Sequence, residues 1–150
     1  MRSILLLPAL LVPLTAADLR AQDGCDDPRT VAEMERLRQS VGTPDVMCVE
    51  FARGDVDGDG REDAVLDIGY EMPGMENGGA SLLHVLLSDP SAPLLAEPDA
   101  ERGTVQSVRI AGPELHVETL DYRPDDPPCC PSRITDLVLR VMGHEIIRVM

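Results

Sequence analysis

Residues 47–70 read MCVEFARGDVDGDGREDAVLDIGY, and this stretch decides the fold that we expect. Apolar residues occupy alternate positions over residues 47–51 and again over residues 64–70. A period of two is typical of β-strands, since successive side chains point to opposite faces. Six of the nine intervening residues 55–63 are aspartate or glycine, which favours a tight turn. The stretch therefore predicts two antiparallel strands joined by an acidic loop.

The chain after this hairpin carries the same kind of pattern. Residues 82–87 form a nearly continuous apolar run, which is typical of a strand buried on both faces. Further alternating segments predict strands over residues 105–110, 115–120, 137–141 and 145–149. Most connections are short, which favours antiparallel neighbours and a total of about seven strands. The connections over 71–79 and 88–103 are longer.

One helix is predicted before the strands. Asp27-Pro28 opens a turn, and Thr30 with Glu33 has the spacing of a capping box. Apolar residues then recur at spacings of three to four, as expected for one helical stripe, at Val31, Met34, Leu37 and Val41. Gly42 and Pro44 end the helix. The fold class that we expect is mainly β (α+β), with this N-terminal helix packed on one twisted antiparallel sheet.

The length and the N-terminal residues define the expected domain organisation. The chain has 150 residues, which suits one domain. Residues 1–21 begin with a short basic start, continue with an uncharged apolar run, and end in small residues, which is the layout of a secretory signal peptide. Cleavage after Ala17 or Ala21 fits this layout. We expect a single β-rich domain over residues 22–150, in a periplasmic or extracellular location.

Charge and hydropathy exclude some classes of partner. The formal net charge is -14, so nucleic acid and anionic lipid surfaces repel the chain. After the first run no segment approaches the roughly 20 apolar residues that a membrane-spanning helix needs. We therefore expect no nucleic-acid partner and no membrane span.

The acidic loop has the composition of a calcium site. Calcium takes about six to eight oxygen ligands, and a short loop can supply them when acidic residues recur at alternate positions. Glycines at positions 58 and 60 allow the sharp turn. The expected ligands are the carboxylates of Asp55, Asp57, Asp59 and Asp63 and the backbone carbonyl of Arg61. The alternative is a solvated turn without a cation, since Asp and Gly are also common turn residues.

The loop resembles that of a known group of calcium-binding repeats. An EF-hand closes with a glutamate at position twelve, where this chain has Leu66. The stretch from Gly54 to Leu66 instead resembles the calcium loop of FG-GAP repeats and of the related bacterial VCBS repeats. The resemblance covers about thirteen residues and implies calcium as the cofactor. It implies no propeller, because repeat folds need several copies and this chain has one.

A longer resemblance covers most of the chain after the signal peptide. The acidic loop, then Gly78-Gly79 before an apolar strand, then the segment from Asp126 to Ser132 with its two cysteines, look like small uncharacterised exported bacterial proteins. This resemblance implies a shared fold and no particular activity.

Four cysteines are the disulfide candidates: Cys25, Cys48, Cys129 and Cys130. An even number in an exported chain favours disulfides. Neighbouring Cα atoms lie only about 3.8 Å apart, so a bond between the adjacent pair would be strained. Bonds from that pair to the other two cysteines are one arrangement. A bond between Cys25 and Cys48, which leaves the adjacent pair bonded to each other or free, is the other. Zinc is a rival use, although no Cys-x-x-Cys pair is present.

No catalytic constellation is apparent. His84, His116 and His144 have no neighbouring pattern of Ser, Cys or acid that forms a triad. We expect a calcium-binding protein with a structural or binding role, whose partner is a protein or another component of the cell envelope. The alternative is a small exported inhibitor or accessory protein of an extracellular enzyme, since an acidic loop can dock on a basic cleft.

Overall fold

The computed structural model describes residues 24–42, 45–71, 79–97, 103–127 and 130–149. A single turn of 3-10 helix (Gly24–Asp26) leads into helix α1 (Pro28–Val41), and eight strands follow. The strands are β1 (Val46–Gly54), β2 (Asp63–Glu71), β3 (Gly79–Leu86), β4 (Leu95–Ala96), β5 (Thr104–Ala111), β6 (Glu114–Asp121), β7 (Arg133–Met142) and β8 (Glu145–Arg148). All seven predicted strand segments are present, and the two-residue strand β4 is an addition.

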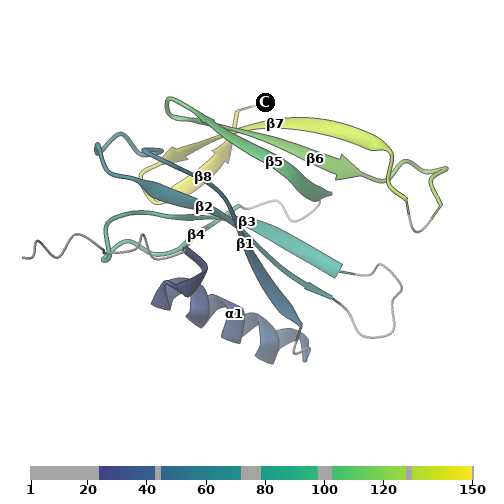
Figure 1. Cartoon of the computed structure of the whole chain (residues 1–150), viewed down its shortest axis with the longest axis horizontal. Coiled ribbons are helices and arrows are strands. Elements are labelled where there is room, and N and C mark those ends of the chain that lie inside the picture. Colours follow the sequence, from purple (N-terminus) through teal and green to yellow (C-terminus); the bar gives the residue numbers. More distant parts are fainter. Residues whose placement is uncertain (1–23, 43–44, 72–78, 98–102, 128–129, 150) are drawn as a thin grey trace, which may run out of the picture.

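The strands form two sheets, so the expected single sheet is wrong while the mainly β class is confirmed. The first sheet has the order β1-β2-β3-β4 and the second has the order β5-β6-β7-β8. Every neighbouring pair is antiparallel. Figure 1 shows the two sheets as separate layers, with α1 on the face of the first sheet that points away from the second.

The physical reason for two layers lies in strands β2 and β3, which are apolar on both faces. Val65 and Val85 point toward the second sheet, whereas their neighbours Leu66 and His84 lie on the opposite face, where His84 faces α1. The second sheet alternates more strictly, and β6 is buried at every second residue. The main core lies between the sheets and includes Val65, Leu83, Val85, Leu115, Val117, Leu137 and Leu139. Apolar burial of this kind is the dominant favourable term in folding.

Helix α1 begins and ends close to where the sequence predicts, but its cap is different. Asp27 is the N-cap, its carboxylate accepts a hydrogen bond from the Arg29 N–H at 2.9 Å, and Pro28 follows at the first helical position. The predicted capping box at Thr30 is wrong because Thr30 is buried inside the helix. Proline at the first position favours this earlier start, since its fixed φ suits the helix and its missing N–H is not needed there.

The face of α1 that packs on the first sheet is narrower than the predicted stripe. Leu37 is buried and Met34 packs with it against Val46 and Ile68, whereas Val31 is exposed. Gly42 ends the helix with φ 73°, and its N–H donates to the Arg38 carbonyl. A left-handed C-terminal residue is the usual reason for glycine at this place.

The β1–β2 pair holds the acidic loop at one end of the first sheet. Gly54 pairs with Asp63 as the last rung of the ladder, so residues 55–62 form the connection between the two strands. The register shifts between Glu50 and Ala52, which marks a bulge in β1. The predicted hairpin is therefore present with the loop at the expected place.

The cysteines follow one of the two arrangements that the sequence left open. Cys25 and Cys48 form a disulfide with each other, which ties the entry of the domain to strand β1. Bonds from the adjacent pair to these two cysteines are thereby excluded. Cys130 is also disulfide-bonded, and Cys129 lies outside the described residues. The predicted signal peptide over residues 1–21 lies outside them as well. Of the helices described, none is long and apolar enough to cross a membrane.

Candidate metal centre

The acidic loop folds around its own backbone. Asp55 accepts hydrogen bonds from the Gly58 N–H at 2.7 Å and from the Gly60 N–H at 2.9 Å, one on each carboxylate oxygen. Both glycines have positive φ, 87° and 82°, which a residue with a Cβ rarely adopts. The two glycines thus turn the chain so that the loop N–H groups point inward at Asp55.

The base of the loop is anchored in the protein interior. Val56 is fully buried and belongs to the core between the sheets. Asp63 is only 1% exposed, and its two oxygens accept hydrogen bonds from the Val56 N–H at 3.0 Å and the Ser88 N–H at 2.8 Å. The Asp63 carboxylate is therefore held in a fixed orientation by two backbone donors from separate segments.

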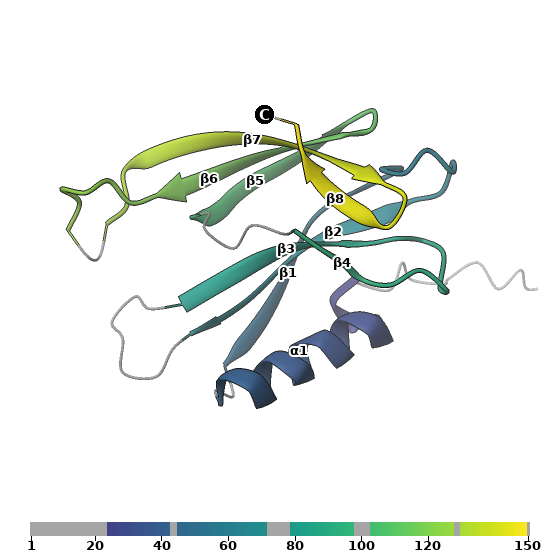
Figure 2. The ribbon, with the colours of Figure 1, turned by 180° about the vertical axis from the view of Figure 1, so that it is seen from behind.

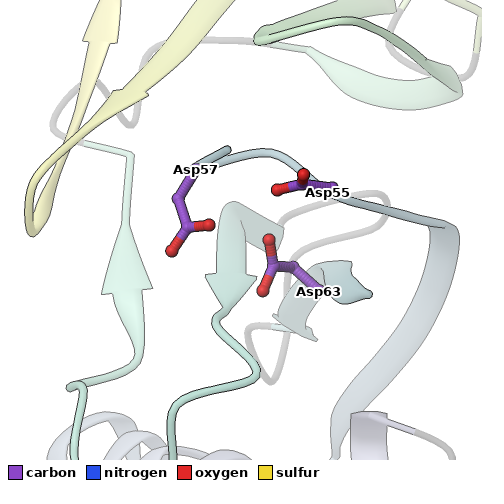
Figure 3. Close-up of side chains that lie close together, drawn as sticks. All are labelled: Asp55, Asp57 and Asp63. Atoms are coloured by element: carbon purple, nitrogen blue, oxygen red, sulfur yellow. The ribbon is translucent and has the colours of Figure 1, made fainter. Parts of the chain in front are cut away.

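Three of the four predicted aspartates come together. Asp55, Asp57 and Asp63 each offer a carboxylate oxygen, and these oxygens all lie within 4.8 Å of one another. Figure 3 shows the three side chains directed toward a common space between the loop and the start of β2. Calcium–oxygen distances are about 2.3–2.6 Å, so ligands on opposite sides of one ion lie up to about 5 Å apart. The spacing of the three oxygens is compatible with one such ion.

The electrostatics of the loop are those of gathered like charges. The pKa of Asp57 is raised, first by partial desolvation of its carboxylate in the loop and then by the neighbouring charges of Asp63, Asp59 and Asp55. A hydrogen bond from the Asp59 N–H opposes this effect. Both causes disfavour the ionised form. A cation among these groups would remove the repulsion and favour that form.

Asp59 lies apart from this cluster. Its carboxylate accepts from the Arg61 N–H at 2.8 Å and forms a salt bridge with the Arg61 guanidinium at 2.6 Å. These contacts lower the pKa of Asp59, the side-chain hydrogen bond from Arg61 being the largest cause. The structure therefore groups Asp55, Asp57 and Asp63 without Asp59. The carbonyl of Arg61 as a ligand stays a prediction.

Two supporting residues were not identified from the sequence. Ser88 donates its N–H to Asp63 and lies 25 positions away, so no local pattern could indicate the contact. Val56 could have been found, since it is the one apolar residue between the aspartates of the loop. Its burial explains why the loop has a defined conformation at its first turn.

The chemistry of the donor set fits a hard cation. Carboxylate oxygens are the preferred ligands of calcium and magnesium, and the cluster contains no sulfur or imidazole that would favour a softer metal. No protein-family model, no curated protein and no solved structure matches this chain.

Proposed function

We propose that this chain is an exported calcium-binding domain with a structural or binding role. The observation that carries the proposal is the convergence of Asp55, Asp57 and Asp63 at the end of the β1–β2 pair. The resemblance of the loop to FG-GAP and VCBS calcium loops supports the same cation. Bound calcium would supply a divalent charge that turns the mutual repulsion of these carboxylates into attraction.

Asp63 is the central ligand of the proposed site. Each of its oxygens accepts one backbone hydrogen bond, and a carboxylate oxygen retains a further lone pair for a cation. Asp55 is oriented in a similar way by Gly58 and Gly60. Two of the three carboxylates are thus positioned before a cation arrives, which reduces the entropy cost of binding.

Calcium at this place would have a structural consequence. Asp63, at the start of β2, accepts hydrogen bonds from Val56 in the acidic loop and from Ser88 in the segment after β3. A cation bound to Asp63 and to the loop carboxylates would therefore hold three segments together. Calcium suits this role better than magnesium, which keeps its water and demands a smaller octahedral shell.

Export is supported by the cysteines and by the N-terminal pattern. The disulfide between Cys25 and Cys48 is of the kind that persists in oxidising compartments and is rare in the cytosol. The signal-peptide layout of residues 1–21 predicts the same destination. Calcium is abundant enough outside the cell for sites of about 10⁻⁴–10⁻³ M dissociation constant to be used in extracellular modules.

Isothermal titration calorimetry with calcium tests the proposal. We expect saturable binding of one ion to the chain after removal of residues 1–21. Asp57→Asn should weaken binding at least about tenfold, because a charged ligand is lost. Glu62→Gln is the matched control, since it removes the same charge from an exposed residue of the same loop and should change binding little. Equal effects of the two substitutions would show a diffuse charge effect, and no binding to the wild type would refute the site.

A further inference from the structure

A pocket lies on the face of the first sheet that points away from the second sheet. It has a volume of about 310 Å³ and lies between α1 and strands β3 and β4. Figure 2 shows α1 lying across this face of the first sheet. The helix contributes Arg29, Glu33 and Arg36, and the sheet side contributes His84, Leu94 and Ala96. This volume is at the lower end of the range of about 300–1,000 Å³ for small-molecule sites.

The walls of the pocket are held by hydrogen bonds. All five N–H groups of Arg29 are used, two toward Asp27 and three toward the carbonyls of Leu87, Asp89 and Ala92. Arg29 therefore fastens the helix to the segment between β3 and β4. A wall fixed in this way loses little freedom when a ligand binds.

The floor of the pocket is equally constrained. His84 is 1% exposed, and its Nδ1 lies 2.9 Å from the Leu82 carbonyl. In the β3–β4 ladder His84 is paired with Ala96. A carbonyl oxygen only accepts, so Nδ1 carries a proton and the ring orientation is set. The Nε2 atom lies 4.0 Å from the Glu33 carboxylate.

The arginines that line the pocket are each paired with an acid. Two arginines and a histidine line it with one acid, Glu33, and Arg29 is bound to Asp27 beside the pocket. Glu33 is already paired with Arg36 through two short hydrogen bonds of 2.7 and 2.6 Å. The charges of Glu33 and Arg36 therefore compensate each other, and the remaining walls are apolar at Leu94 and Ala96.

Arg36 is the group that can receive a ligand. Its side chain is 61% exposed, and its hydrogen bonds to Glu33 use two of the five N–H groups of a guanidinium, which leaves three. Glu33 holds the guanidinium in place on the helix that also carries the pocket residue Arg29. A planar, oriented guanidinium is suited to a carboxylate.

We propose that this pocket binds a small carboxylate ligand with a short apolar body. The carboxylate pairs with the Arg36 guanidinium, and the apolar part lies against Leu94 and Ala96. The carboxylate can belong to a free organic acid or to the C-terminus of a peptide. The pocket shares no residue with the acidic loop, so this inference is independent of calcium binding.

Binding can be followed by amide chemical shifts of the folded, disulfide-bonded chain titrated with sodium butyrate, in calcium and in chelator. We expect saturable shifts confined to α1 and the β3–β4 region under both conditions. Arg36→Gln should weaken the affinity about tenfold or more, as expected for a charge-assisted hydrogen bond. Arg38→Gln, on the same helix and outside the pocket lining, should leave it unchanged. Ala32→Leu keeps every charge and a helix-favouring residue while obstructing the pocket, and should abolish the shifts.

A second series distinguishes the two sources of the carboxylate. Acetyl-Ala-Leu with a free C-terminus should bind more tightly than butyrate if a peptide end is the ligand, and no more tightly if a free acid is. The amide of the same peptide, and butylamine, should not bind. The proposal is overturned if butyrate gives no saturable shifts, if the amide or butylamine binds as well as the acids, or if Arg36→Gln binds as the wild type does.

Discussion

Two isosteric substitutions in the acidic loop separate its structural role from its proposed role as a cation ligand. Asp63→Asn changes a buried carboxylate that accepts two backbone hydrogen bonds, from Val56 and Ser88. Asp57→Asn changes an exposed carboxylate that accepts one local bond, from the Asp59 N–H at 3.1 Å. Each substitution removes one negative charge from the proposed site, so both should weaken calcium binding. Their effects on the protein without calcium should differ.

The loss of stability that we expect for Asp63→Asn follows from the loss of one hydrogen-bond acceptor. The amide keeps one oxygen for one of the two N–H groups and presents an NH₂ group to the other. The Val56 N–H is buried, and leaving such a donor unsatisfied costs about 1–3 kcal/mol. We therefore expect the free energy of unfolding in chelator to fall by about 2 kcal/mol.

For Asp57→Asn we do not expect a loss of stability in chelator. The raised pKa of Asp57 means that its ionised form is less favourable in the folded than in the unfolded state. This unfavourable contribution is present at neutral pH and disappears as the pH falls below the unfolded-state pKa of 3.8. The Asp57→Asn variant is uncharged at this position and lacks the contribution, and its amide oxygen can still accept from Asp59. In chelator the variant should therefore be as stable as the wild type or slightly more stable.

Urea unfolding in chelator and in excess calcium is the appropriate assay. Asp57→Asn should lose the calcium-dependent part of the stability alone, whereas Asp63→Asn should lose stability under both conditions. An Asp57→Asn variant that is strongly destabilised in chelator would show that the carboxylate has a structural partner in the loop. An Asp63→Asn variant as stable as the wild type in chelator would refute the assigned role of its two hydrogen bonds.

Three further predictions concern the cap of α1, the disulfide and a glycine of the acidic loop. Asp27→Ala should lower the free energy of unfolding in urea by about 1 kcal/mol through loss of the N-cap. The hydrogen bond from Arg29 lowers the pKa of Asp27, so the stability that this carboxylate contributes is present above its unfolded-state pKa of 3.8. That stability is lost as the pH falls through the lowered pKa of the folded state. Replacing Cys25 and Cys48 together by alanine should lower the free energy of unfolding by about 3 kcal/mol, as expected for a disulfide that spans 23 positions. An unchanged midpoint of urea unfolding would contradict this stabilising role of the disulfide. Gly60→Ala should destabilise the loop by about 1–2 kcal/mol through its φ of 82°, and a thermal midpoint equal to that of the wild type would count against this conformation.

The strands could be predicted from the sequence, but their division into sheets could not. Alternation of apolar residues, together with the nearly continuous apolar run over residues 82–87, located all seven longer strands. It does not show which strand edges pair. The connection over residues 88–103 separates the two sheets, and it contains the two-residue strand β4, which is too short to have a pattern.

The candidate site was predicted in its composition and only partly in its geometry. The spacing of aspartates and glycines located the loop, and the positive φ angles of Gly58 and Gly60 confirm the need for glycine at both places. Spacing alone placed Asp59 among the ligands. It could not show that the neighbouring guanidinium of Arg61 competes for that carboxylate, nor that a distant N–H at Ser88 orients Asp63.

The thermal midpoint of the wild-type chain in calcium, in magnesium and in chelator tests the central claim most directly. A ligand that binds only the folded state adds about 2.7 kcal/mol of stability at about a hundred times its dissociation constant. For a domain of this size the midpoint in calcium should exceed that in chelator by on the order of 5 to 10 °C. Magnesium should raise it less. Identical midpoints in saturating calcium and in chelator would contradict calcium binding at Asp55, Asp57 and Asp63.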